Sequence, residues 1–359
     1  MKPRRSLSLI LLAALSACQS APVNPPALNA AVRQQNATPQ NQGNRFLCVV
    51  EPVDDQGAQI KVMDLQSRLI RRVYVPGRIL SLEGDRQQNM LYLSVRSGAE
   101  QPRFDLYALN LQNLQLSRPA SFSQASIQPV DFRVRDQTLF VAGLQRGEGD
   151  LAALRLNQGG WSSLARSFPP GQLQWSRNPD QLHSVHFDED NITRTTIDVR
   201  QRRIVQRQTF AHGVPFGNNM GLSAPDGDYF YALHQLQGLV AIYAFDIEAG
   251  SVNRDIATET AVGILFSSAL SKDGRFLYAT IDNRLERYEL VGTQLRRLPP
   301  IELNTREARY LTLSDDQRTL YVTHDGEQSV SRIRLAPDHL TFQLDEIPFP
   351  GENTQITVF

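Results

Sequence analysis

The 359-residue chain has few of the residues that usually supply covalent, redox or metal chemistry. It contains two cysteines, two tryptophans and six histidines. It also lacks a Cys-x-x-Cys pair, a His-Glu-x-x-His pair, a Gly-x-Ser-x-Gly elbow and a phosphate-binding glycine loop. These absences argue against a dithiol oxidoreductase, a zincin-type metalloprotease, an α/β-type serine hydrolase and a P-loop nucleotide-binding protein.

An excess of charge of one sign is missing as well. The 37 basic residues balance 37 acidic ones, and 34 basic residues remain if Lys2, Arg4 and Arg5 are removed with an N-terminal signal. A near-neutral domain lacks the broad basic footprint that binds nucleic acid or an anionic membrane surface. No nucleic-acid partner is therefore expected.

The N-terminus has no apolar run long enough to cross a membrane. Its run Leu9–Leu15 is far shorter than the roughly 20 residues that a spanning helix needs. Basic residues precede this run, and the small residues Ser16 and Ala17 follow it. This arrangement is typical of a secretory signal rather than of a membrane span.

The stretch Leu15-Ser16-Ala17-Cys18 resembles the lipobox of bacterial lipoproteins. The resemblance implies that residues 1–17 are a lipoprotein signal peptide and that Cys18 is lipidated, which would anchor the chain to a membrane. Gln19 follows in place of an aspartate, which favours the outer membrane, facing the periplasm or the cell surface. The alternative is an ordinary secretory signal with an incidental cysteine.

Residues 18–44 form the next predicted segment. Beyond Cys18 this segment is rich in Ala, Pro, Asn and Gln and shows no apolar period, so a flexible linker is expected before a domain over residues 45–359. The second cysteine, Cys48, lies in the apolar run Phe46–Val50, which predicts a buried, inert thiol. Because no disulfide is expected, stability must come from a sizeable core.

A short apolar-aromatic phrase recurs along this domain. Its seven copies open at intervals of 43 to 48 residues, which is the length of four strands with their turns. The openings are Phe46, Leu91, Leu139, Leu182, Phe230, Leu277 and Leu320. Each copy is followed by a segment that alternates apolar and polar residues, which predicts strands and no helix.

The phrases Leu270–Thr280 and Leu313–Thr323 resemble the YVTN-type repeat of lactonase-like propellers. The resemblance implies an all-β, seven-bladed propeller of four-stranded antiparallel blades, with the first strand of each blade innermost. The tail Asn353–Phe359 is similar to the segment Asn304–Leu313 that leads into an inner strand, so the C-terminal strand is predicted to complete the first blade. Six or eight blades are the alternatives.

Histidines recur at one position of the repeat. His186, His234 and His324 each lie four residues after a strand opening, which places them on one predicted rim. His212 is expected to reach the same rim, with Asp188 and Asp190 nearby. Imidazoles and carboxylates can bind a metal or act as acid and base, but structural roles or partner contacts are favoured here. We expect no catalytic residue, no metal and no cofactor.

The sequence favours a non-catalytic function. An anchored, neutral propeller without a known catalytic motif is most simply a binding or scaffold module for an envelope protein or a cell-wall component. The alternative is a lactonase-type hydrolase acting on a small lactone or a sugar-derived substrate. The histidines that such enzymes carry before a Pro-Asp-Gly turn are missing from the matching stretch Asn219–Gly227.

Overall fold

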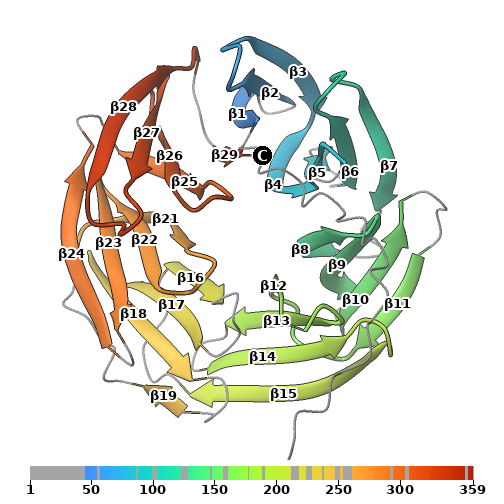
Figure 1. Ribbon diagram of the computed structural model, residues 1–359. Coiled ribbons are helices and arrows are strands. Elements are labelled where there is room, and N and C mark those ends of the chain that lie inside the picture. Colours follow the sequence, from blue (N-terminus) through green and yellow to red (C-terminus); the bar gives the residue numbers. More distant parts are fainter. Residues whose placement is uncertain are drawn as a thin grey trace, which may run out of the picture. The chain divides into compact units, whose positions relative to one another are not determined.

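The strands of the domain are arranged as a ring of seven sheets around a central axis, and the region that the innermost strands border is called the channel below (Figure 1). This computed structural model describes residues 45–54, 57–85, 88–98, 103–122, 128–145, 148–156, 161–176, 178–187, 191–211, 218–223, 229–236, 238–246, 251–253, 261–291, 294–303, 307–351 and 355–358. Every regular element among them is a strand, and none is a helix that could cross a membrane. The predicted all-β propeller with seven blades is confirmed.

Each blade is an antiparallel sheet whose strands follow one another from the channel outward. Blades 1 to 4 consist of β29 (Gln355–Val358), β1 (Phe46–Asp54), β2 (Gly57–Asp64) and β3 (Ile70–Pro76); β4 (Arg78–Asp85), β5 (Met90–Ser97), β6 (Arg103–Asn110) and β7 (Leu116–Phe122); β8 (Gln128–Arg135), β9 (Thr138–Gln145), β10 (Glu148–Arg155) and β11 (Trp161–Arg166); and β12 (Gln172–Trp175), β13 (Gln181–Phe187), β14 (Asn191–Asp198) and β15 (Arg203–Ala211). Blades 5 to 7 consist of β16 (Asn218–Ser223), β17 (Tyr229–Leu236), β18 (Leu239–Asp246), β19 (Ser251–Asn253) and β20 (Ala261–Val262); β21 (Leu265–Leu270), β22 (Phe276–Ile281), β23 (Arg284–Val291) and β24 (Gln294–Glu302); and β25 (Ala308–Leu313), β26 (Thr319–His324), β27 (Ser329–Leu335) and β28 (Phe342–Pro348).

The outer strand of blade 5 is described in two pieces. The outer position is shared by two short strands, β19 and β20, which both pair with β18. β19 pairs with the end of β18 at Ala244–Asp246, and β20 pairs with its beginning at Leu239 and Val240.

The repeated phrase specifies the hairpin between the first two strands of blades 6 and 7. In blade 6 the Ser271 hydroxyl accepts the Phe276 N–H at 2.8 Å and donates to Asp273. Ser314 makes the equivalent bonds in blade 7. Gly274 takes a φ of 70° in this turn, a conformation in which a residue without Cβ is least strained. Asp273 and Gly274 thus form the turn of this hairpin.

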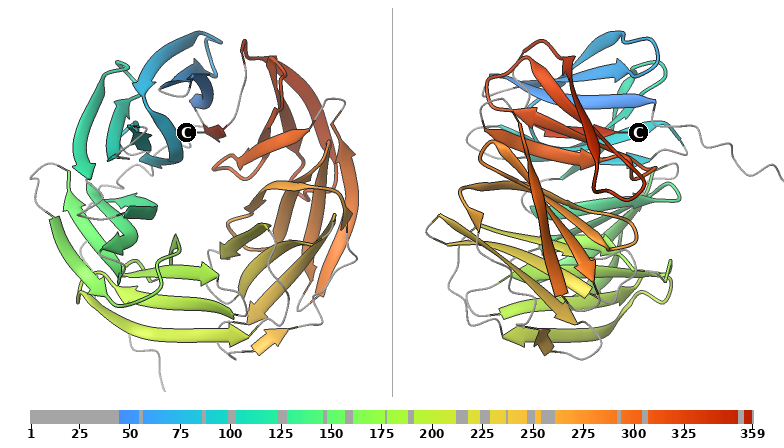
Figure 2. Two further views of the ribbon diagram at one scale, coloured as in Figure 1. Left: turned by 180° about the vertical axis from the view of Figure 1, so that it is seen from behind. Right: turned by 60° about the vertical axis from the view of Figure 1, so that its left-hand side comes forward.

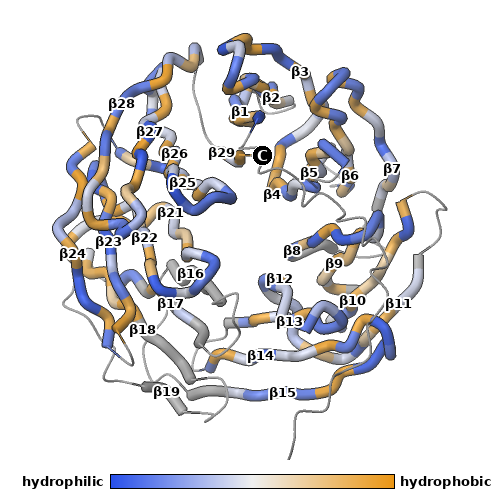
Figure 3. The backbone as a smooth tube through the Cα atoms, in the orientation of Figure 1, coloured by the Kyte–Doolittle hydropathy of each residue, from blue (hydrophilic) through white to orange (hydrophobic). Residues whose placement is uncertain are grey.

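Second strands such as β22 are buried along their whole length, whereas outer strands such as β24 alternate buried and exposed residues; Figure 3 shows the hydropathy along the chain. Buried apolar residues form clusters between neighbouring blades at six interfaces of the described part: 1–2, 2–3, 3–4, 5–6, 6–7 and 7–1. Cys48 is fully buried in the cluster that joins blades 1 and 2, and burial raises the pKa of its thiol, as expected for an inert cysteine.

The ring closes where the two ends of the domain meet. β29 pairs with β1, with Val358 opposite Leu47 and Gln355 opposite Val50, which confirms the predicted closure. Figure 2 shows the red C-terminal strand beside the blue first blade. Ile356 and Val358 are buried there with Phe349.

A buried lysine holds the segment that leads into β29. The Lys61 side chain is fully buried, donates to the Pro350 carbonyl, and lies 3.2 Å from the Glu51 carboxylate. Burial lowers the pKa of Lys61, and Glu51 opposes that shift. Gly351 follows with a φ of 98°, and a Cβ there would lie 1.8 Å from Glu51 Oε1. Only glycine fits this crossing without a shift of its neighbours.

Candidate functional site

The histidines of the predicted rim have separate partners. His186 lies at the end of β13, where its Nδ1 is 3.1 Å from the Pro170 carbonyl oxygen. His324 ends β26 in another blade and is fully buried. His234 lies in β17, opposite Asn219 of β16 in the strand pairing. Four other predicted residues lie outside the described part of the chain: Cys18, Asp188, Asp190 and His212. Among the described residues, no group of three or more His, Cys, Asp or Glu side chains could hold a metal ion.

His324 is the buried end of a hydrogen-bonded chain in blade 7 whose middle member is Ser331. Its Nε2 is 2.7 Å from Ser331 Oγ, and Ser331 donates to Glu346 Oε1 at 2.5 Å. Because the single hydroxyl proton of Ser331 goes to Glu346, the serine oxygen accepts the N–H of His324. Burial lowers the pKa of His324 to about 4. The ring is therefore a neutral structural donor at neutral pH.

We expect acid to destabilise the propeller through His324. The unfolded chain protonates this residue below a pKa of 6.5, whereas the folded chain does so only near 4, so stability falls as the pH drops through that window. The slope is at most about 1.4 kcal/mol per pH unit. Urea unfolding across this range should therefore show a shallower loss for His324→Gln, whose amide still donates to Ser331.

Other groups also titrate in the same window and must be separated from His324; burial lowers the pKa of His339 as well. Buried His183 has its pKa lowered to about 3, which adds to the loss of stability. Glu83 has its pKa raised to about 7, which acts in the opposite direction because the folded state then binds the proton more tightly. Only the difference between the wild type and His324→Gln isolates His324, and identical slopes for the two proteins would contradict its assignment.

A charged cluster of a different kind lies on the inner strands of blades 2 and 3. Arg133 of β8 is 3.1 Å from Asp131 Oδ1 and 3.8 Å from Glu83 Oε2 of β4. Glu83, Asp131 and Arg133 keep 24%, 14% and 26% of their side-chain surface exposed, so water reaches all three. We call these three residues the channel cluster.

The packing of the two strands places the channel cluster near the free edge of β8. Phe132 and Val134 pack against blade 2, so the intervening Arg133 is directed to the other face of β8. Glu83 belongs to blade 2, and Arg133 reaches it around the free edge of β8. That edge borders the channel, because β8 is the innermost strand of its sheet (Figure 1).

The carboxylates of the cluster also satisfy the free edges of the inner strands. Asp131 Oδ2 accepts the backbone N–H of Leu173 in β12 at 2.8 Å, and the Glu83 carboxyl accepts that of Val134 in β8. These bonds join neighbouring blades at the channel and leave fewer unpaired edge groups. They also fix the direction of both carboxylates.

Burial sets the electrostatics of the cluster. It raises the pKa of Glu83 to about 7, with a further rise from Asp131 that Arg133 and the Val134 N–H oppose. Burial disfavours the charged form of Arg133, but Asp131 and Glu83 outweigh this and raise its pKa. At neutral pH the cluster therefore combines a fixed cation with a carboxyl group that can both accept and donate a proton.

Sequence reasoning placed the candidate site at the other end of the channel. Glu83 and Arg133 each lie two residues before the end of their inner strand, near the hairpin that joins the first two strands of the blade. The predicted histidine rim follows the second strand, at the opposite end. No known motif marks the cluster. Its only signal in the sequence is the presence of charged residues in inner strands where apolar residues occupy the alternate positions.

Comparisons with known proteins support the fold. No protein family and no curated protein sequence matches the chain. Among solved structures, a Bacteroides fragilis protein provisionally assigned as a 6-phosphogluconolactonase matches with a TM-score of 0.63 and 11% identity, over 89% of this chain and 99% of that one. The periplasmic gluconolactonase of Pseudomonas aeruginosa matches with 0.60 and 17%, over 87% and 98%.

A third solved structure shows that this architecture hosts different chemistries. Hydrazine synthase of Kuenenia stuttgartiensis matches with a TM-score of 0.59 and 12% identity, over 84% of this chain and 99% of that one. The chain is therefore a propeller of the architecture found in lactonases, and its activity has to be argued from its own residues.

Proposed function

We propose that this protein is a hydrolase that opens a small, sugar-derived lactone in its central channel. The observation that carries the proposal is the channel cluster, in which the Glu83 carboxyl has a pKa of about 7 and lies 3.8 Å from the Arg133 guanidinium. The lactonase architecture of the structural neighbours supports it. The alternative function of the sequence analysis is thus preferred over the non-catalytic scaffold.

The reaction needs a base, a place for negative charge and a proton for the leaving oxygen. Ionised Glu83 accepts a proton from water as the water oxygen bonds to the lactone carbonyl carbon. Arg133, held by Asp131, stabilises the negative charge on the carbonyl oxygen. When the ring C–O bond breaks, the proton passes from Glu83 to the ring oxygen, and the product is the open hydroxy acid. Water, lactone and product balance without a cofactor.

The test is turnover of a lactone panel by the full chain purified in detergent. Five- and six-membered sugar lactones with and without a phosphate would be followed by acid release in a weakly buffered indicator. We expect hydrolysis of at least one lactone well above its spontaneous rate. Background rates throughout, together with specific capture of an envelope partner, would favour the scaffold function.

We further propose that the domain is held at a membrane through a lipid on Cys18, on the outer membrane if the source has one. The signal-like residues before Cys18 support this. The expected result is recovery of the wild-type chain in the membrane fraction and of Cys18→Ser in the soluble fraction. Equal partitioning of the two proteins would count against the anchor.

A further inference from the structure

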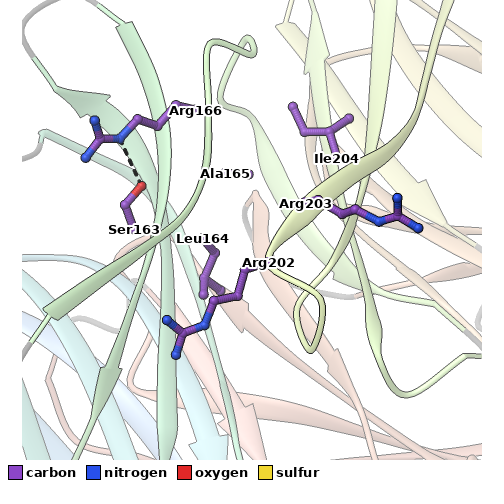
Figure 4. Close-up of a pocket in the computed structure, with 7 residues that line it drawn as sticks. All are labelled: Ser163, Leu164, Ala165, Arg166, Arg202, Arg203 and Ile204. Carbon is purple, nitrogen blue, oxygen red and sulfur yellow. Dashed lines mark hydrogen bonds between the residues drawn. The ribbon is translucent and has the colours of Figure 1, made fainter.

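The outer wall of the propeller carries a cleft between blades 3 and 4. It lies between β11 and β15, has a volume of about 430 Å³, and is lined by Ser163, Leu164, Arg166, Arg202, Arg203 and Ile204 (Figure 4). It is remote from the innermost strands that carry the channel cluster, because β11 and β15 are the outermost strands of their sheets.

The floor of the cleft is part of the core. Leu164 is 6% exposed and packs in the hydrophobic cluster that joins blades 3 and 4, where Ile204 is also packed. Arg207 ties the two walls together by donating to the Ser167 carbonyl at 2.7 Å. The cleft is thus bordered by packed strands, so its walls hold their spacing without a ligand.

Three arginines line this cleft, and their bonding partners are neutral. Arg166 donates to Ser163 Oγ at 3.2 Å, and Arg203 donates to Gln201 Oε1 at 2.8 Å. Arg202 is exposed. None of the three forms an ion pair with any carboxylate of the described ranges. The acidic group nearest to Arg166 in this hydrogen-bond network is the buried Asp150. Its carboxylate accepts the hydroxyl proton of Ser163 at 2.7 Å, and the oxygen of the same hydroxyl accepts the Arg166 N–H.

In blades 6 and 7 several arginines are paired with acidic residues. Arg297 of β24 bonds both oxygens of Glu286 at 2.8 and 3.0 Å, and Arg296 pairs with Glu289. Arg332 of β27 pairs with Asp345 of the outer strand β28. These arginines are neutralised by the neighbouring strand. The cleft between blades 3 and 4 therefore concentrates positive charge that the fold leaves uncompensated, on a chain whose total charge is balanced.

We infer that this cleft is a binding site for a phosphate-bearing ligand. Figure 4 shows Arg166 and Arg202 extending toward the same side of the cleft, while Arg203 extends toward the opposite side. Two guanidinium forks from different blades match the several oxygens and the double charge of a phosphate group. Leu164 and Ile204 provide an apolar surface for the carbon part of the ligand. The phosphate belongs either to a soluble compound or to a lipid headgroup.

The experiment uses the full chain with Cys18→Ser, so that an N-terminal lipid does not itself bind membranes. Pyrophosphate is titrated by calorimetry, and flotation is measured with phosphatidylcholine vesicles with and without phosphatidic acid. The test variant adds Arg166→Ser and Arg202→Ser. The matched control is Arg200→Ser, an 81% exposed arginine that precedes β15 and does not line the cleft.

We expect the double variant to bind its probe at least about tenfold more weakly, because each charge-assisted hydrogen bond contributes about 1.5 to 3 kcal/mol. The control should bind like the parent, and binding should weaken with added salt. Arginine-dependent binding of pyrophosphate indicates a soluble phosphate ligand, and arginine-dependent flotation alone indicates a lipid headgroup. The inference is overturned if neither probe binds, or if the double variant and the control bind both probes equally.

Discussion

Removal of residues 355–359 is expected to lower the free energy of unfolding by roughly 5 kcal/mol or more, since truncating one buried isoleucine alone costs about 2 to 5 kcal/mol. The truncation removes the strand that pairs with β1 and the buried side chains of Ile356 and Val358. It also exposes the edge of β1 to water and to other chains. Urea unfolding monitored by circular dichroism measures the loss.

Point variants on the same strand provide the control. Ile356→Asp places a charge at a position that is 8% exposed, whereas Thr357→Asp places it on the more exposed side of the strand. The first should destabilise the ring severely and the second only slightly. A truncated chain that unfolds at the same urea concentration as the wild type would show that β29 does not close the ring.

Glu83→Gln is expected to reduce lactone turnover by about 100- to 10,000-fold, the usual contribution of a general base. Glutamine has nearly the same shape and still accepts the Val134 N–H, so the fold is retained. The base must be ionised to accept a proton from water. The wild-type kcat/KM should therefore rise with pH through about 7 and level off above it.

The pH profile separates a catalytic role of Glu83 from a structural one. Glu83→Gln should lose the limb near pH 7 along with its activity. The matched control is Glu302→Gln, an exposed residue at the end of the outer strand β24, which should keep both. Arg133→Lys should retain part of the rate, because it keeps the charge but not the guanidinium geometry. A Glu83→Gln protein with an unchanged rate and profile would exclude this base.

The fold could be predicted because its determinants are local and repeated. The seven strand openings all fall in the second strands of the seven sheets, and the Ser271 and Ser314 hairpins follow from short-range bonds. The closing strand could be predicted because the C-terminal residues Asn353–Phe359 resemble the segment Asn304–Leu313 that leads into another inner strand.

The site was harder to predict because equivalent positions in a repeat have different surroundings. His186 is half-buried beside a carbonyl, whereas His324 at the matching position is fully buried against Ser331. Glu83 and Arg133 come from different blades and meet only around a strand edge. The arginine cleft between β11 and β15 likewise arises because no acidic side chain of the described neighbouring strands pairs with its arginines. Such pairings become visible only when neighbouring blades are placed side by side.

A crystal structure of the protein soaked with a non-hydrolysable lactone analogue tests the central claim most directly. The account predicts the analogue in the channel, with its carbonyl oxygen beside the Arg133 guanidinium and the Glu83 carboxyl on the side from which water attacks. An analogue bound instead at the rim near His186, with the channel cluster untouched, would contradict it.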